Sequence, residues 1–291
     1  MRNLIIAISV TVLLFAAGCE KTPGTSGADV PQAVLSTFEG MYPGAEDVQW
    51  TSRHSYWVAS FAEYSRTKSP AAASGRNSAW FDDSGKWYMT EFHSELSFLP
   101  EMVKAAFSLC EYASWKVDDI DVIHRDGVSV VYVIEVEGML DGREAEADLY
   151  FSEDGVLVKE RFDVDDDYDY WDYIPGRPVS SVSDAVNSIY PGARIIDIEE
   201  DDGMMEVEIV GEDKIFREIY FSLGLEWLMT KTEMRLRDLP ENVRLALARY
   251  REVDDIHFIE TPSSDYYLAE VEVYDDDITV RISPEGEVTE I

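Results

Sequence analysis

The tetrapeptide Tyr42-Pro43-Gly44-Ala45 returns unchanged as Tyr190-Pro191-Gly192-Ala193, and this duplication is the strongest indication of the fold. A second motif is duplicated in the same way, since Leu99-Pro100-Glu101 returns as Leu239-Pro240-Glu241. Self-similarity at long spacing is typical of a chain built from copies of one structural unit. The sequence therefore predicts two tandem halves, each with one copy of both motifs.

Apolar residues beside these motifs follow a helical period. The residues that share this pattern are Val34, Phe38 and Met41; Val103, Phe107 and Cys110; Val182, Val186 and Ile189; and Val243, Leu247 and Tyr250. The spacing i, i+4, i+7 places each trio on one face of a helix. Pro100 and Pro240 suit the first turn of a helix, where a missing N–H breaks no hydrogen bond. We therefore expect four short helices.

Each predicted helix is followed by strand-like segments and by a hairpin turn that contains glycine, at residues 81–85, 151–155, 221–224 and 282–286. We therefore expect an α+β fold of four helix-plus-antiparallel-sheet repeats, arranged as two tandem pairs. The pairs span residues 31–162 and 179–291. Residues 163–178, which are acidic and aromatic, form the linker between them.

Alternation along the predicted strands separates an apolar phase, which we expect beneath the helices, from a polar phase on the helix-free face. The polar phase carries the large side chains Trp80, Tyr150 and Tyr220 and the carboxylates Glu135, Glu137, Glu206 and Glu208. Aromatic residues among polar ones are typical of protein-recognition surfaces, so these seven residues are the predicted partner-binding site. The alternative is an ordinary solvated sheet face, which needs no partner.

The amino terminus predicts export and lipid attachment. One arginine, a short apolar run and the ending Ala16-Ala17-Gly18-Cys19 are typical of a secretory signal. This ending resembles the lipobox of bacterial lipoproteins, which implies cleavage after residue 18 and lipid on Cys19. Residues 19–30 are then a flexible tether. Glu20, in place of an aspartate, favours the outer membrane by the same resemblance, and which side of that membrane is exposed stays open.

The composition restricts the function. A formal net charge of −35 excludes binding to nucleic acid and favours a partner with a basic patch. Two cysteines and four histidines offer no zinc cluster, and no HExxH or Gly-x-Ser-x-Gly motif is present. Carboxylates are too numerous for one pair to indicate a glycosidase. We therefore expect a protein that is not an enzyme and holds no cofactor.

The linker offers the best candidate for a metal, through Asp163, Asp165, Asp166, Asp167, Asp169 and Asp172. Oxygen ligands suit calcium, but the EF-hand glycine and glutamate are missing. A calcium-dependent structural or adhesive protein is therefore the alternative to a binding module. The tyrosines and tryptophan between these aspartates favour a simpler role, in which they fix the linker to a domain.

The tandem units, the Tyr-Pro-Gly-Ala helix ends and the hairpin Trp80-Phe81-Asp82-Asp83-Ser84-Gly85, followed by Thr90-Glu91, resemble the PepSY-like repeats of bacterial envelope proteins. Those repeats are similar in fold to the β-lactamase inhibitor protein and to the propeptide inhibitor domain of thermolysin-type peptidases. The resemblance implies a binding or inhibitory module. It does not extend to activity against β-lactamase, because the disulfides and target-binding loops of that inhibitor have no counterpart here.

Overall fold

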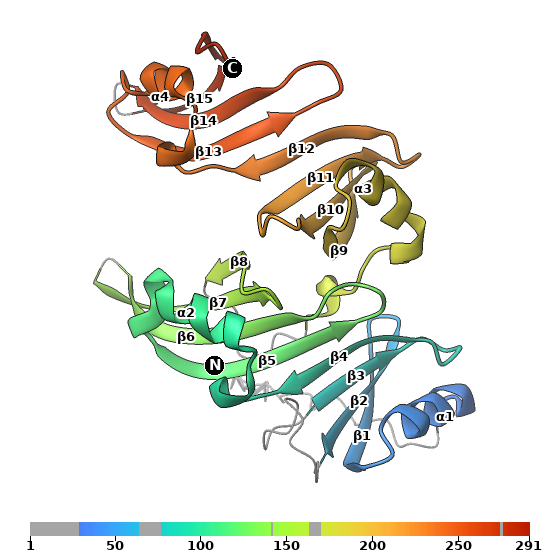
Figure 1. Ribbon diagram of the computed structural model, residues 1–291. Coiled ribbons are helices and arrows are strands. Elements are labelled where there is room, and N and C mark those ends of the chain that lie inside the picture. The colour runs from blue at the N-terminus through green and yellow to red at the C-terminus, as the bar shows by residue number, and fades with distance from the viewer. Residues whose placement is uncertain (1–28, 64–76, 141, 163–169, 274–275) are drawn as a thin grey trace, which may run out of the picture.

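The computed structural model describes residues 29–63, 77–140, 142–162, 170–273 and 276–291. Within these ranges the chain forms two eight-stranded antiparallel sheets, one from each half of the sequence (Figure 1). Each α-helix is followed in sequence by four strands. The structure thus has the tandem antiparallel architecture that the duplicated motifs predict. The predicted signal peptide and Cys19 lie outside the described residues.

Within each sheet, every strand pairs with its neighbours in sequence, and all of these pairs are antiparallel. The first sheet contains β1 (Ala45–Arg53), β2 (Tyr56–Glu63), β3 (Asn77–Phe81), β4 (Trp87–His93), β5 (Lys116–Arg125), β6 (Val131–Leu140), β7 (Arg143–Ser152) and β8 (Leu157–Phe162). The second contains β9 (Arg194–Asp201), β10 (Met204–Val210), β11 (Phe216–Ser222), β12 (Trp227–Glu233), β13 (Val253–Glu260), β14 (Tyr266–Val273), β15 (Asp276–Ile282) and β16 (Val288–Glu290).

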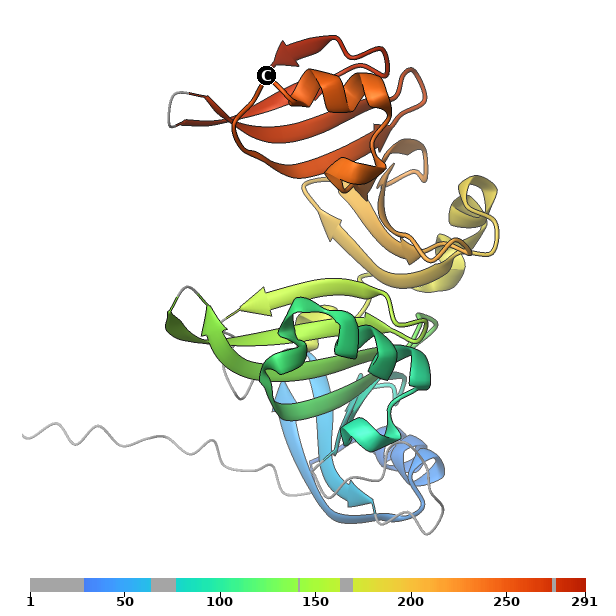
Figure 2. The same ribbon diagram turned by 60° about the vertical axis from the view of Figure 1, so that its left-hand side comes forward.

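The four helices cover one face of each sheet, as the two views in Figures 1 and 2 show. They are α1 (Gln32–Met41), α2 (Glu101–Leu109), α3 (Ser183–Ile189) and α4 (Glu241–Leu247). The first two positions of each apolar trio are buried, but Met41 is 39% exposed and Cys110 is half-buried just beyond the end of α2. Cys110, Ile189 and Tyr250 are only partly buried but still pack against the apolar cluster beneath their helices, so Met41 is the one third position that the pattern misplaces.

The hairpin glycines have a second role besides the turn itself. Gly85 and Gly155 have positive φ angles of 84° and 75°, which glycine adopts without strain. A Cβ atom at Gly155 would lie 2.4 Å from the Met102 carbonyl oxygen in α2, and one at Gly85 would meet the α1 backbone in the same way. These hairpins therefore pack directly against the first turn of a helix. In the third hairpin the positive φ falls on Leu225 instead of Gly224.

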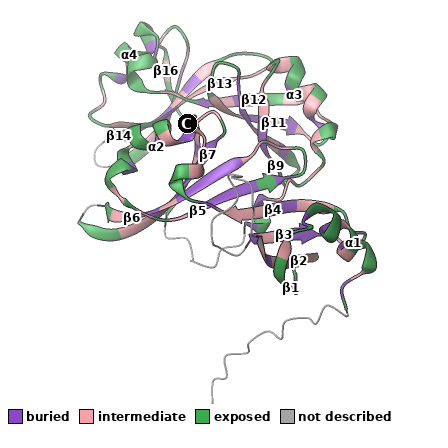
Figure 3. Cartoon of the chain, turned by 60° about the horizontal axis from the view of Figure 1, so that its bottom comes forward, coloured by how far each residue is buried: buried purple, intermediate pink, exposed green. Residues whose placement is uncertain are grey.

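Burial follows the sheets (Figure 3). Buried residues concentrate in the central strands, whereas the outer faces of the helices are exposed. Among the described residues, no helix has both the length and the apolar character needed to span a bilayer.

Candidate functional site

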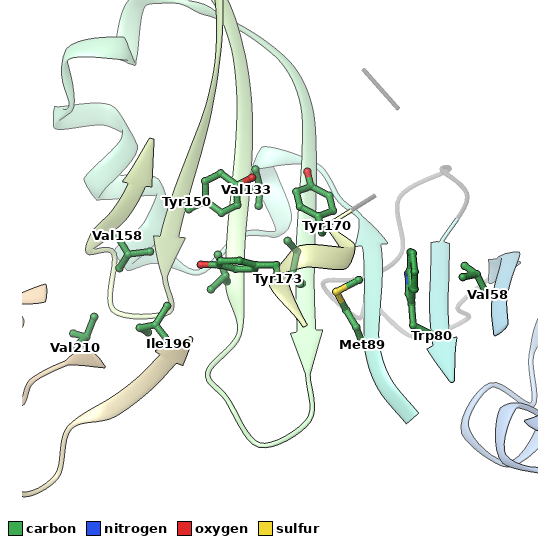
Figure 4. Packing of buried hydrophobic residues seen from close by; sticks show 12 residues of the cluster. Val58, Trp80, Met89, Val133, Tyr150, Val158, Tyr170, Tyr173, Ile196 and Val210 are labelled. Atoms are coloured by element: carbon green, nitrogen blue, oxygen red, sulfur yellow. The ribbon is translucent and has the colours of Figure 1, made fainter. Parts of the chain in front are cut away.

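The prediction that Trp80 and Tyr150 are exposed is wrong. Both side chains lie on the helix-free face of the first sheet, as alternation predicts, but only 0% and 1% of their surfaces are exposed. Tyr170 and Tyr173, from the segment between the sheets, lie against Tyr150 with ring centroids 6.4 and 5.6 Å away (Figure 4). The chain itself therefore covers this part of the expected partner-binding surface. The two tyrosines fix the linker in the way their spacing predicts.

The second sheet completes this cover. Val133 lies on the helix-free side in one apolar cluster with Tyr173 and with Ile196 and Val210 from β9 and β10 (Figure 4). A sequence signal for this burial exists, because residues 131–134 form an unbroken apolar run. Such a run is typical of a strand that is buried on both faces. The apolar run at residues 131–134 therefore argues against a solvated face around Trp80 and Tyr150.

A buried arginine joins the two halves of the chain. The Arg125 guanidinium, fully buried, lies 3.0 Å from the carboxylate of Asp197, whose side chain is 1% exposed. It also donates hydrogen bonds to the carbonyl oxygens of Tyr173 (2.9 Å) and Ile196 (2.6 Å). Its Cζ atom lies 3.9 Å from the centroid of the Tyr173 ring. Because these partners come from the linker and from β9, Arg125 fixes the second sheet relative to the first.

Glu208, one of the predicted partner-binding residues, lies at this junction instead of on an open surface. It pairs in register with Asp197 across β9 and β10. Burial, and secondly the charge of Asp197, raises the pKa of Glu208 to about 8. Its Oε2 atom is buried and has no hydrogen-bond partner among the described residues. At the contact between the two sheets, burial and the nearby Asp197 therefore destabilise the ionised form of Glu208.

Tyr220 and Glu206 remain accessible on the helix-free face of the second sheet. The two residues are directly paired across β10 and β11, and both are half-buried. The Tyr220 hydroxyl donates a hydrogen bond of 2.9 Å to Glu218, which forms a 3.0 Å ion pair with Lys231. Burial raises the pKa of Glu206, and the neighbouring Glu218 raises it further. This face therefore presents an aromatic ring among closely spaced carboxylates.

Glu135 and Glu137 belong to the first sheet, so the structure does not bring all seven predicted residues together. Both are half-buried on β6. Glu137 accepts a 2.7 Å hydrogen bond from Lys116, and Glu135 pairs in register with Asp148. The predicted surface is thus divided between two sheets, with its first-sheet aromatic residues covered.

A groove not predicted from the sequence lies between β8 and the second sheet. Two adjoining hollows of about 640 and 500 Å³ share Leu157, Val158, Glu233 and Arg235 in their linings. Leu157 and Val158 begin β8, whereas Glu233 ends β12 and Arg235 precedes a 3₁₀ turn at Leu236–Asp238. The groove exists only because the sheets are held at this angle, so no local sequence pattern indicates it.

A histidine and three carboxylates form a separate cluster on the first sheet. The His93 Nδ1 atom lies 3.1 Å from Asp119 and 3.0 Å from Asp121, and Tyr170 donates a 3.0 Å hydrogen bond to Asp121. Potential ligand atoms of Glu91, His93 and Asp121 lie within 4.8 Å of one another. Hydrogen bonds to Asp119 and Asp121 raise the pKa of His93 to about 11. A metal needs neutral imidazole, so an imidazolium held by carboxylates accounts for this cluster.

Comparison with known proteins gives a consistent result. The model of the PepSY-like family, which is described as beta-lactamase-inhibitor-like, matches residues 71–159 and 205–290. Solved structures with similarity include a DUF2874 family protein from Bacteroides ovatus (31% identity, covering 48% of this chain and 92% of that one, TM-score 0.40). They also include a BLIP-like protein from Bacteroides fragilis (30% identity, covering 48% and 92%, TM-score 0.41). No curated protein matches the chain.

The first matched region spans β3 to the start of β8 in the first sheet, the second spans β10 to β16 in the second sheet, and together they cover more than half of the sequence. The antiparallel sheets, each covered by helices on one face, agree with the resemblance seen in the hairpin and helix-end motifs. This protein belongs to the PepSY-like, beta-lactamase-inhibitor-like family.

Proposed function

We propose that this protein is a non-enzymatic binding module of the bacterial envelope, which holds a cationic protein or peptide on the helix-free face of the second sheet. The observation that carries the proposal is the accessible group of Tyr220, Glu206 and Glu218 beside the groove. The formal net charge of −35 adds a long-range attraction for a positively charged partner.

The first sheet acts as the support in this proposal. Its helix-free face is used internally, since Tyr150 lies against Tyr170 and Tyr173, and Trp80 is buried in the same apolar cluster. Burial on both sides and the Arg125–Asp197 ion pair hold the second sheet in a fixed position. A rigid, preformed surface loses little entropy when a partner binds, which suits an inhibitor of the kind the family description names. A peptidase is the class of target that the sequence resemblance favours.

The cellular location belongs to the same proposal. The amino-terminal sequence supports cleavage after residue 18 and attachment to the membrane through lipid on Cys19, with residues 19–30 as a tether. Glu20 supports the outer membrane. We also propose that each α-helix and the four strands after it form one repeat unit, so that residues 31–162 and 179–291 each contain two.

The calcium alternative depends on the six aspartates of the linker. Asp163, Asp165, Asp166, Asp167 and Asp169 lie outside the described residues. The remaining member, Asp172, lies 3.7 Å from Arg161. An aspartate beside an arginine has its charge already compensated, so it does not favour a calcium site.

Site-specific photo-crosslinking tests the proposed function in cells. A photoreactive phenylalanine analogue replaces Tyr220 in one variant and Leu245 in a matched control. Leu245 is 65% exposed on α4, on the opposite side of the second sheet. We expect a defined crosslinked partner at position 220 only, and we expect the double variant Glu206→Gln, Glu218→Gln to reduce it. Equal crosslinking at both positions, or none at 220, would refute the proposal.

A further inference from the structure

The first sheet ends in a strand whose outer edge faces the groove. Strand β8 is the last in the strand order, and it pairs regularly with β7 from Lys159 to Phe162. Figures 1 and 2 show β8 along the side of the first sheet that is nearest to the second. Because pairing with β7 uses only one side of a strand, half of its backbone N–H and C=O groups point away from the sheet. Among the described residues, no backbone hydrogen bond from another segment reaches this side.

The other sheet edges are occupied, short or bulged. On the edge of β9, the carbonyl oxygen of Ile195 accepts a hydrogen bond from the Ser129 N–H, and that of Ile198 accepts one from the Gly176 N–H, both 2.9 Å long. Strand β16 has only three residues. Strand β1 is interrupted by a bulge between Glu46 and Gln49. Native proteins commonly protect edges by such devices. Strand β8 has a bulge of its own between Leu157 and Lys159, so its regular edge is limited to Lys159–Phe162, and what sets this edge apart is that the strand lines both hollows of the groove.

The surroundings of β8 favour an extended peptide with positive charge. The hollows that adjoin it are lined by five carboxylates and three cationic side chains. Several of these groups are already engaged: Lys214 pairs with Asp154, and Lys159 lies 5.2 Å from the centroid of the Tyr173 ring. Of the carboxylates, Glu218 pairs with Lys231 and Asp238 with Arg237. The lining groups that remain outside such pairs in the described part of the chain are Glu111, Glu160 and Glu233 against Arg235, which still favours positive charge in a ligand. Apolar contact is available from Leu157 on β8 and from Phe216 on β11. An alternation of apolar and basic side chains matches this lining.

We propose that an extended cationic peptide segment pairs with the free edge of β8 and lies beneath the helix-free face of the second sheet. It adds a ninth strand to the first sheet. Backbone hydrogen bonds to β8 supply affinity, and the side chains that alternate along the peptide are read by Glu233 and its neighbours. This inference rests on the proposed function, because it specifies how a cationic partner reaches the second sheet.

Hydrogen–deuterium exchange of the full chain tests the pairing directly. The probe is a synthetic hexapeptide of alternating valine and lysine, added at up to millimolar concentration. We expect slower exchange, by about tenfold or more, at alternate amides within residues 159–162, with no change in β1. Two N-methylated forms of the peptide, one in each alternation phase, separate backbone pairing from side-chain binding. One form should bind about tenfold more weakly, while the other keeps its affinity.

A charge variant provides the matched control. Glu233→Lys should weaken binding of the hexapeptide, while Glu285→Lys, which makes the same change in the exposed fourth hairpin, should not. If both N-methylated forms bind equally, or if β8 shows no protection, edge pairing is overturned. If protection appears only on the second sheet, or if crosslinking at Tyr220 succeeds without protection of β8, the proposed function survives and this inference fails. Failure of crosslinking at Tyr220 contradicts the proposed function itself.

Discussion

Replacing Glu208 with glutamine should make the protein more stable at alkaline pH and leave its stability unchanged at acidic pH. The pKa of this carboxyl group is raised from 4.5 to about 8, chiefly by burial. A folded-state pKa above the unfolded value contributes stability that is fully present below about pH 4.5. That contribution is lost as the pH rises through about 8, where Glu208 ionises in the folded protein. Glutamine keeps the neutral shape and has no charge to bury.

The magnitude follows from the same value. A pKa of about 8 in place of 4.5 corresponds to an upper limit of about 5 kcal/mol, at about 1.4 kcal/mol per pKa unit. Glu208 is not fully sealed from water, and solvent access reduces this penalty. We therefore expect a gain of about 1–2 kcal/mol in the free energy of unfolding at pH 9, or about 2–8 °C in Tm.

Thermal unfolding of both proteins at pH 5, 7 and 9 measures this difference. Glu226→Gln is the control, because it removes the same charge from an exposed turn of the same sheet. The reasoning is refuted if Glu208→Gln is no more stable than the parent at pH 9. It is equally refuted if the stabilisation is the same at pH 5 and pH 9, or if Glu226→Gln produces the same pH-dependent gain.

Three further outcomes are expected. In urea titrations, Trp80→Ala should lower the free energy of unfolding by about 3–5 kcal/mol, because the Trp80 side chain is fully buried. The control Trp171→Ala should lower it by about 1 kcal/mol or less, because Trp171 is 43% exposed. NMR should show that His93 remains protonated between pH 5 and 8, because its pKa is raised from 6.5 to about 11. Its contribution to stability is fully present below about pH 6.5 and is lost as the pH rises through about 11. Gly155→Ala should destabilise the protein more than Gly203→Ala in thermal melts, because both have positive φ but only at Gly155 would the new Cβ meet the backbone of α2.

Much of the local structure could be predicted because it depends on short-range rules. Helical period places Val34 and Phe38 beneath α1, and strand alternation correctly assigns Trp80 and Tyr150 to the helix-free face. Turn residues locate the hairpins. The ends of the apolar faces were less well predicted: Met41 is the last residue of α1 but is 39% exposed, and Cys110 lies one residue beyond the end of α2.

The site was only partly predictable. The carboxylates around Tyr220 follow from alternation, but nothing local distinguishes Glu206, which stays accessible, from Glu208, which is buried beside Asp197 two residues further along β10. Arg125 gave no signal, because its partners Tyr173 and Asp197 are distant in sequence. The continuous apolar run around Val133 was the one available indication that the first sheet is covered on both sides.

The sequence by itself determined the elements, their order and the face to which each side chain points, since these follow from periods of 3.6 and 2 residues and from turn chemistry. Only the tertiary structure decided which helix-free face meets solvent. That outcome depends on Tyr170, Tyr173 and β9 folding back over the first sheet. An unbroken apolar run such as residues 131–134 can indicate that a strand is covered on both faces, but it does not identify the distant segment that covers it.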